Sequence, residues 1–189
     1  MSPAEVPGAV LPRIAEVLRR HRVLDFAFTG GVAVGVWSAP RQTRDIDVCG
    51  SLPIEEVDRL VALHDGLRSG PGELPDLVRF RVADWDVDLF VSKSAYDREC
   101  LGRAVAATID GVEARVVTAE DLLVHKMIKL KTDRRRILQD LSDIRAVLHA
   151  QPDLDWKYLA TWLPAEQHDF LRMAAAATDE ELARRLLGK

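Results

Sequence analysis

Two aspartates, Asp45 and Asp47, flank one isoleucine in a segment that alternates between polar and apolar residues, Asp45-Ile46-Asp47-Val48-Cys49. Alternation with period two predicts a strand, and residues two apart on a strand project from the same face. Both carboxylates are therefore expected on one face, where a divalent cation such as Mg²⁺ would relieve the repulsion between them. For this pattern alone, the alternative is an edge strand whose acidic side faces water.

A second acidic pair repeats the pattern in Trp85-Asp86-Val87-Asp88-Leu89-Phe90. If the two predicted strands lie near each other in one sheet, three or four carboxylates converge on one patch. Folding tolerates such a patch poorly unless a cation sits there. Two metal ions about 3.5–4 Å apart are the usual arrangement for in-line phosphoryl displacement. The paired patterns therefore predict a metal site for phosphate chemistry.

A strand-to-helix turn, Thr29-Gly30-Gly31, follows the alternating segment Leu24–Phe28. Two glycines at the start of a helix present bare backbone N–H groups at its positive end, which is a cradle for phosphate. The alternative is a tight turn that requires positive φ. The next glycine is Gly35, so the dinucleotide fingerprint G-x-G-x-x-G is not satisfied, and no Gly-Lys-Ser/Thr follows to make a P-loop.

A basic cluster lies later in the chain and is opposed only by Asp133; its members are Lys126, Lys129, Lys131, Arg134, Arg135 and Arg136. A solvated helix face explains such a cluster by itself. It becomes a phosphate site only if an anionic ligand is expected nearby.

The elements that position these residues follow from periodicity and turn signals. Helices are expected over Leu11–Arg22, Gly31–Ala39 and Ile54–Leu67, and strands over residues 24–28, 45–49, 77–83, 85–91, 104–109 and 112–117. The last two strands flank Asp110-Gly111, a strong hairpin signal. Ser69 to Pro75 is expected to be a loop.

From Thr118 onward only helices are expected, the first opened by a variant capping box, Thr118-Ala119-Glu120-Asp121. They cover about residues 119–131 and 135–149, with shorter helices after Pro152, Pro164 and Thr178. We therefore predict an α/β (α+β) fold with a mixed sheet flanked by helices over residues 1–117. A helical C-terminal subdomain is predicted over 118–189.

Composition excludes several classes of protein. The 189 residues suffice for one sizeable domain with a small appended bundle. A net charge of −4 argues against a protein that coats nucleic acid non-specifically. No apolar run approaches the ~18 residues that a membrane helix needs, and the start lacks the pattern of a secretory signal. Cys49 and Cys100 are expected to be reduced, buried thiols, so a cytoplasmic location is predicted.

The combined motifs resemble those of the DNA polymerase β-type nucleotidyltransferase superfamily. The resemblance covers residues 28 to 145 and is carried by strand, Gly30-Gly31, short helix, Asp45-Ile46-Asp47 and a third aspartate, Asp88. The segment Arg41 to Asp47 is especially similar to the abortive-infection and toxin-type members. Their later helical segment has its counterpart in Glu120-Asp121-Leu122-Leu123 to Lys126, followed by Asp140-Leu141-Ser142-Asp143-Ile144.

This resemblance implies a role for each matched residue. Gly30 and Gly31 would hold the nucleotide phosphates, and Asp45 and Asp47 would bind Mg²⁺ or Mn²⁺. Asp88 would complete the metal site and serve as, or help, the base for an acceptor hydroxyl. Lys126 would approach the triphosphate, and a Lys126→Ala substitution is expected to weaken nucleotide binding by ~1–3 kcal/mol.

The sequence also departs from the family pattern. Many relatives have Gly-Ser in place of Gly30-Gly31, and toxin-type members commonly have a lysine where Gln139 precedes Asp140. Asp140 and Asp143 are therefore expected to cap their helix or to pair with the basic cluster.

The remaining candidates have ordinary alternatives. Arg41 and Arg44 would grip phosphates or pair with surface acids. Asp86 would support Asp88 or face solvent. His125 is expected to be an ordinary core or surface residue. The tryptophans are expected in the core; they are Trp37, Trp85, Trp156 and Trp162.

The leading hypothesis is an enzyme that transfers a nucleoside monophosphate from an NTP to a hydroxyl and releases pyrophosphate. The acceptor is RNA (a tRNA end, for a toxin with an antitoxin partner), a small molecule such as an antibiotic, or a protein. The alternatives are a non-catalytic nucleotide- or partner-binding module that keeps the fold, and an antitoxin-like protein whose acidic patch docks a basic partner. No membrane partner is expected.

Overall fold

The structure, a computed structural model, describes residues 7–40, 42–64, 66–68, 76–132, 137–177 and 181. The strands are β1 (Phe26–Phe28), β2 (Asp45–Gly50), β3 (Leu67–Arg68), β4 (Leu77–Val82), β5 (Trp85–Val91), β6 (Val105–Ile109) and β7 (Val112–Val116). The helices are α1 (Pro7–Arg20), α2 (Gly30–Trp37), α3 (Ile54–Leu63), α4 (Ala95–Arg103), α5 (Ala119–Thr132), α6 (Ile137–Ala150), α7 (Trp156–Trp162) and α8 (Ala165–Ala176).

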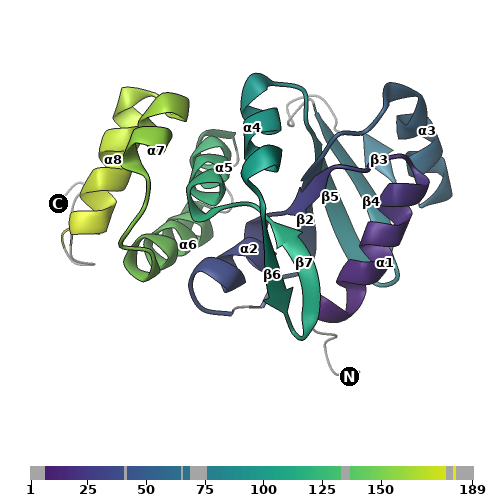
Figure 1. The fold of residues 1–189 in the computed structure, drawn as a ribbon, viewed down its shortest axis with the longest axis horizontal. Coiled ribbons are helices and arrows are strands. Elements are labelled where there is room, and N and C mark those ends of the chain that lie inside the picture. The colour runs from purple at the N-terminus through teal and green to yellow at the C-terminus, as the bar shows by residue number, and fades with distance from the viewer. Residues whose placement is uncertain are drawn as a thin grey trace.

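The described strands form one seven-stranded sheet in the order β3-β4-β5-β2-β1-β7-β6. The pairs β2–β5 and β1–β7 are parallel, and the other neighbours are antiparallel. Helices lie on both sides of this sheet (Figure 1). The predicted fold class, a mixed sheet flanked by helices, is confirmed. The parallel pair β2–β5 brings together the two strands that carry the aspartate pairs.

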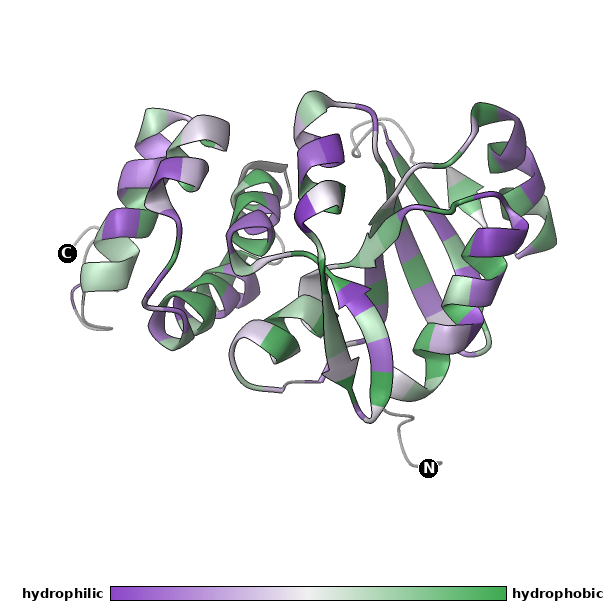
Figure 2. Ribbon diagram, viewed as in Figure 1, coloured by the Kyte–Doolittle hydropathy of each residue, from purple (hydrophilic) through white to green (hydrophobic). Residues whose placement is uncertain are grey.

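Two hydrophobic clusters cover the two faces of the sheet. The first packs α1 and α3 against one face, with Leu11, Ile14 and Leu60 among its fully buried side chains. The second joins α2 and the helices α5 to α8 on the other face, and Leu122 and Leu171 lie in it. Figure 2 shows hydrophobic and hydrophilic residues alternating along the central strands, as a sheet with differing faces requires.

The C-terminal helices pack on one another and on α2. Helix α5 contacts α2, α6 and α7, and α6 contacts α8. In Figure 1, α7 and α8 lie at the opposite end of the molecule from α1 and α3. The division at residues 117/118 stays a prediction, and the helix expected after Thr178 lies almost wholly outside the described residues. Among the helices that are described, none has both the length and the apolar character needed to span a membrane.

The hairpin predicted at Asp110-Gly111 is confirmed. Both residues have positive φ, 49° and 82°, and Ile109 pairs with Val112 across the turn. Positive φ at both central residues matches the right-handed twist of the two strands. The turn also contacts α1, because the backbone N–H of Gly8 donates to the Asp110 carboxylate at 3.0 Å.

Two elements differ from the sequence-based expectation. Helix α3 ends at Leu63 rather than Leu67, and Leu67–Arg68 instead forms the short edge strand β3 beside β4. Helix α4 was not anticipated at all. It begins at a capping box in which the Ser94 side chain accepts from the N–H of Asp97, whose carboxylate accepts from the N–H of Ser94.

Candidate active site

The carboxylates of Asp47 and Asp88 share one face because of the register between β2 and β5. Asp47 is the Cα partner of Asp88 in this parallel pair, and Asp45 is the partner of Asp86. Ile46 packs in the cluster under α1 and α3, so the aspartates on either side of it project from the opposite face, toward α2 and α5. Acidic side chains from two separate segments therefore meet at one place.

Asp47 is buried and paired with a lysine of α5. Its Oδ1 accepts a hydrogen bond from Lys129 Nζ at 2.8 Å, and the two side chains are 5% and 24% exposed. Burial by itself lowers the pKa of Lys129, but the adjacent Asp47 carboxylate outweighs burial and holds that pKa above its ordinary value. The lysine is therefore charged and neutralises part of the acidic patch.

The Asp88 carboxylate is largely buried and lies near the carboxylates of Asp47 and Asp45. Burial, followed by repulsion from Asp47, raises its pKa to about 6, although Arg79 and Lys129 act in the opposite direction. The Arg79 guanidinium lies 3.4 Å from the Asp88 carboxylate and is half-exposed. A carboxylate with a pKa near neutrality can exchange a proton at physiological pH.

Gly30 allows the first turn of α2 to approach Asp47. Gly30 has φ of 56°, and a Cβ added there would lie 1.7 Å from Asp47 Oδ2. Both the positive φ and the lack of space exclude a side chain. Gly31 follows it, buried in the first turn of α2. The predicted strand-to-helix turn thus lies against the acidic patch, with the N-terminal end of α2 beside Asp47.

We predict that Gly30→Ala lowers the free energy of unfolding by roughly 2–4 kcal/mol, from the cost of positive φ and the displacement of Asp47. Gly102→Ala is the matched control, because a Cβ at Gly102 meets no atom within 4 Å and φ there is not positive. It is expected to be neutral or stabilising by up to ~1 kcal/mol. Urea denaturation of the two variants measures the difference; equal losses would contradict the assigned role of Gly30.

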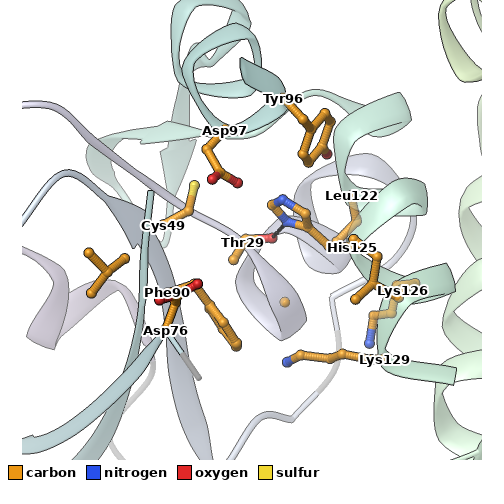
Figure 3. A pocket seen from close by; sticks show the side chains of 13 residues that line it. Thr29, Cys49, Asp76, Phe90, Tyr96, Asp97, Leu122, His125, Lys126 and Lys129 are labelled. Carbon is orange, nitrogen blue, oxygen red and sulfur yellow. Dashed lines mark hydrogen bonds between the residues drawn. The ribbon is translucent and has the colours of Figure 1, made fainter. Parts of the chain in front are cut away.

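A cavity of about 240 Å³ adjoins the acidic patch between the sheet and α5. It is lined largely by apolar atoms, and Phe90, Leu122, Lys129 and Gly30 border it. His125 points from α5 into this region and its Nδ1 lies 2.9 Å from Thr29 Oγ1 (Figure 3). The Thr29–His125 hydrogen bond ties α5 to the residue just before Gly30.

Cys49 and Cys100 are free and buried, as expected. Cys49 lines the cavity and its thiol donates to the carbonyl oxygen of Ala27 at 3.5 Å, while Cys100 Sγ lies 3.9 Å from His125 Nε2. The neighbouring Cys49 side chain and burial raise the pKa of Cys100, so its thiol stays protonated.

Lys126 contacts α6 instead of the strand aspartates. Its Nζ donates to Asp140 Oδ1 at 2.7 Å and to Asp143 Oδ2 at 2.5 Å, and all three side chains are at most 5% exposed. The expected pairing of Asp140 and Asp143 with the basic cluster is present. The contact of Lys126 with a triphosphate stays a prediction, and Lys129 is the lysine found at Asp47.

The other predicted candidates lie near the patch or outside the described residues. Arg44 is exposed just before β2. Asp86 is 64% exposed and pairs with Arg81 at 2.7 Å, which favours its solvent-exposed alternative. Arg41 and the arginines 134–136 lie outside the described residues.

The oxygen donors on this face fit a hard divalent cation such as Mg²⁺. The predicted ligands Asp45, Asp47 and Asp88 share this face with Asp86. Burial, and then repulsion from Asp47, raises the pKa of Asp88. Within the part of the chain that the structure describes, no three His, Cys, Asp or Glu side chains are grouped closely enough to hold a metal ion. Lys129 and Arg79 supply positive charge beside Asp47 and Asp88.

The sequence places Lys129 only in the basic cluster and His125 among ordinary residues, so it does not predict the contact of Lys129 with Asp47 or the contact of His125 with Thr29. Leu122, His125, Lys126 and Lys129 line the cavity together, with the three-, four- and seven-residue spacing of one helix face. That spacing is readable in the sequence. The direction in which this face points is not, because it depends on how α5 packs against α2 and the sheet.

No protein-family model matches the chain, and no curated protein sequence matches it. Solved structures do share its fold. An antigenic nucleotidyltransferase-like protein from Paracoccidioides brasiliensis has a TM-score of 0.58 at 18% identity, over 96% of this chain and 92% of that one. ANT(2")-Ia, solved in complex with adenylyl-2"-tobramycin, has a TM-score of 0.55 at 17% identity, over 89% of this chain and 98% of its own. At these identities the likeness establishes the fold.

Proposed function

We propose that this chain, which has the fold of nucleotidyltransferases, is a metal-dependent enzyme that transfers a nucleoside monophosphate from an NTP to an acceptor hydroxyl. The observation that carries the proposal is the register of β2 and β5, which pairs Asp47 with Asp88 on one face. Asp45 shares that face, and the Gly30 turn lies against Asp47. Carboxylates this close together repel one another and lower the stability of the fold. A catalytic role explains why they are nevertheless present.

The residues divide the chemistry among them. Asp45, Asp47 and Asp88 would hold Mg²⁺ or Mn²⁺, which neutralises charge on the triphosphate when bound. The acceptor oxygen attacks the α-phosphorus, the bond from that phosphorus to the bridging oxygen breaks, and pyrophosphate leaves. Asp88 would also act as, or help, the base that accepts the proton of the acceptor hydroxyl. The backbone N–H groups at Gly30 and Gly31 face the phosphates, with Arg44 and Lys126 as further candidate contacts.

A small molecule is the acceptor class that we favour. The cavity between the sheet and α5 has a volume of about 240 Å³ and a largely apolar lining, which suits part of a compact ligand. ANT(2")-Ia, a protein of this fold, was solved in complex with adenylyl-2"-tobramycin, which supports a small acceptor. Transfer to RNA, as by a toxin with an antitoxin partner, is the other outcome of the test below. Two free, buried cysteines fit a reducing cytoplasm.

The test is transfer of label from each α-³²P-NTP to aminoglycosides, total RNA and cell extract, with Mg²⁺, with Mn²⁺ and with EDTA. We expect one acceptor class to become labelled only when a divalent ion is present. Asp45→Asn should reduce the rate at least about 100-fold, the usual effect of losing one electrostatic group in an active site. NTP binding that needs no metal, survives Asp45→Asn and labels no acceptor would identify a non-catalytic module instead.

A further inference from the structure

Lys129 places a positive charge of the protein itself at the predicted metal site. Its Nζ lies 2.8 Å from Asp47 Oδ1 and 4.9 Å from the centre of the Phe90 ring. Figure 3 shows the side chain extending from α5 toward Phe90. The ammonium is therefore held by a buried carboxylate on one strand and by the face of an aromatic ring on the next.

This contact explains how the fold tolerates its acidic patch. Asp47 is only 5% exposed, so its charge requires a partner within the protein. Lys129 supplies that partner at Asp47, and Arg79 lies beside Asp88 on the neighbouring strand. Within the described residues no group of three acidic or metal-binding side chains is close enough to hold a metal, so the arrangement with Lys129 in place is not a ready-made metal site.

We propose that Lys129 is an intramolecular occupant of the cation site, which pairs with Asp47 in the free protein and is displaced when a divalent ion binds. This inference rests on the proposed function. An ammonium and a divalent ion compete for Asp47 because each occupies the same carboxylate oxygens. The lysine can leave without any movement of the backbone, since its four-carbon stem is flexible and ends in a point charge.

Displacement of Lys129 couples the metal to the nucleotide. The displaced ammonium remains on the cavity-facing side of α5, beside His125 and Lys126, where it needs a new anionic partner. A triphosphate held at the Gly30 turn, which borders the cavity as Lys129 does, supplies one. Each ligand then removes an obstacle to the other, and by linkage the enhancement is equal in both directions. The free protein is expected to bind divalent ions weakly, and to bind them much more tightly once an NTP is present.

The experiment compares Mn²⁺ binding to wild type, Lys129→Met, Lys129→Arg and Lys157→Met by electron paramagnetic resonance titration, with and without a non-hydrolysable NTP. Lys157 is an exposed lysine of α7, so its variant controls for the lost charge. Without nucleotide, Lys129→Met should bind Mn²⁺ about 10-fold more tightly than wild type. In wild type the ion must break the charge-assisted Lys129–Asp47 contact, and the variant has no such contact to break. Lys129→Arg and Lys157→Met should stay within about 3-fold of wild type.

The enhancement of Mn²⁺ affinity by nucleotide should shrink correspondingly in Lys129→Met. Equal or weaker nucleotide-free binding by Lys129→Met than by wild type would overturn this inference and leave the proposed function standing. Absence of Mn²⁺ binding from every protein, with nucleotide present, would overturn both. If Lys129→Met does not fold, acylation of Lys129 in wild type replaces it: Mn²⁺ should accelerate the labelling, and an unchanged rate would overturn the inference.

Discussion

Replacing Lys126 by methionine is expected to lower the free energy of unfolding by about 3–5 kcal/mol, as removal of one partner from a buried ion pair does. Lys126 shares its ammonium between Asp140 and Asp143, and none of the three side chains is more than 5% exposed. Methionine fills a similar volume but leaves two buried carboxylates without their common cation. Urea denaturation at pH 7 measures the loss.

Two further variants show whether the charges cause this effect. The triple variant Lys126→Met/Asp140→Asn/Asp143→Asn removes the whole charge cluster and is expected to recover most of the lost stability. Lys157→Met removes an exposed lysine and should change stability by less than ~0.5 kcal/mol. Unchanged stability of Lys126→Met, together with NTP binding weakened about tenfold or more, would instead favour the triphosphate contact predicted from the sequence.

Much of the fold follows from local patterns that the chain satisfies without help from distant residues. The turn at Asp110-Gly111 is one such pattern, because both residues adopt positive φ at little cost. The start of α5 is another: the N–H of Asp121 donates to Thr118 Oγ1, and that hydroxyl donates back to the Asp121 carboxylate. Each signal is read from residues that are adjacent or three apart.

Elements that depend on tertiary pairing were harder to predict. Leu67 continues the apolar pattern of α3, but Leu67–Arg68 forms hydrogen bonds with the edge of β4 and so belongs to the sheet. Helix α4 is a different case, since Ser94 and Asp97 form a capping box with the same spacing as Thr118 and Asp121. That signal was present in the sequence. Without a long apolar run after it, periodicity alone gave no reason to expect a helix there.

Local patterns also predicted part of the site, but not how its parts come together. Period-two alternation placed Asp45 and Asp47 on one face, and the matching pattern at Asp88 indicated a second strand. That these strands are parallel neighbours in register is a long-range fact that no local pattern contains. The identity of the lysine that pairs with Asp47 could not be predicted from local patterns either. Lys126 and Lys129 are three residues apart on one helix face, and only the packing of α5 directs one to Asp140 and the other to Asp47.

Asp88→Asn is expected to abolish nucleotidyl transfer while making the metal-free protein more stable. Loss of a general base or of one charged group at a phosphoryl-transfer site typically costs about 10²–10⁴-fold in rate. Burial and repulsion from Asp47 raise the Asp88 pKa from 3.8 to about 6 in the folded protein. At about 1.4 kcal/mol per pKa unit, the ionised carboxylate costs the fold up to about 3 kcal/mol, which asparagine avoids.

The sign of this effect sets its pH dependence. Between about pH 4 and pH 6 the folded state holds a proton on Asp88 that the unfolded state has lost, so the stability of wild type falls as the pH rises. Asp88→Asn lacks this decline. The two proteins should therefore be nearly equal in stability at pH 4, and the variant should be about 1–3 kcal/mol more stable above pH 7. Urea denaturation across this range, in buffer containing EDTA, measures the divergence.

Asp47→Asn is the informative comparison, because Asp47 lies on the same face but is buried and hydrogen-bonded to a lysine. Its carboxylate accepts a 2.8 Å hydrogen bond from Lys129, so asparagine there leaves a mostly buried ammonium without its anion. Both variants should lose activity, whereas only Asp88→Asn should gain stability. Opposite stability effects at these neighbouring positions would mean that the ionised Asp88 lowers the stability of the fold. A residue with that effect is retained for its chemistry. If Asp88→Asn were destabilising in the metal-free protein, Asp88 would be a structural charge and the case for its role as a base would fail.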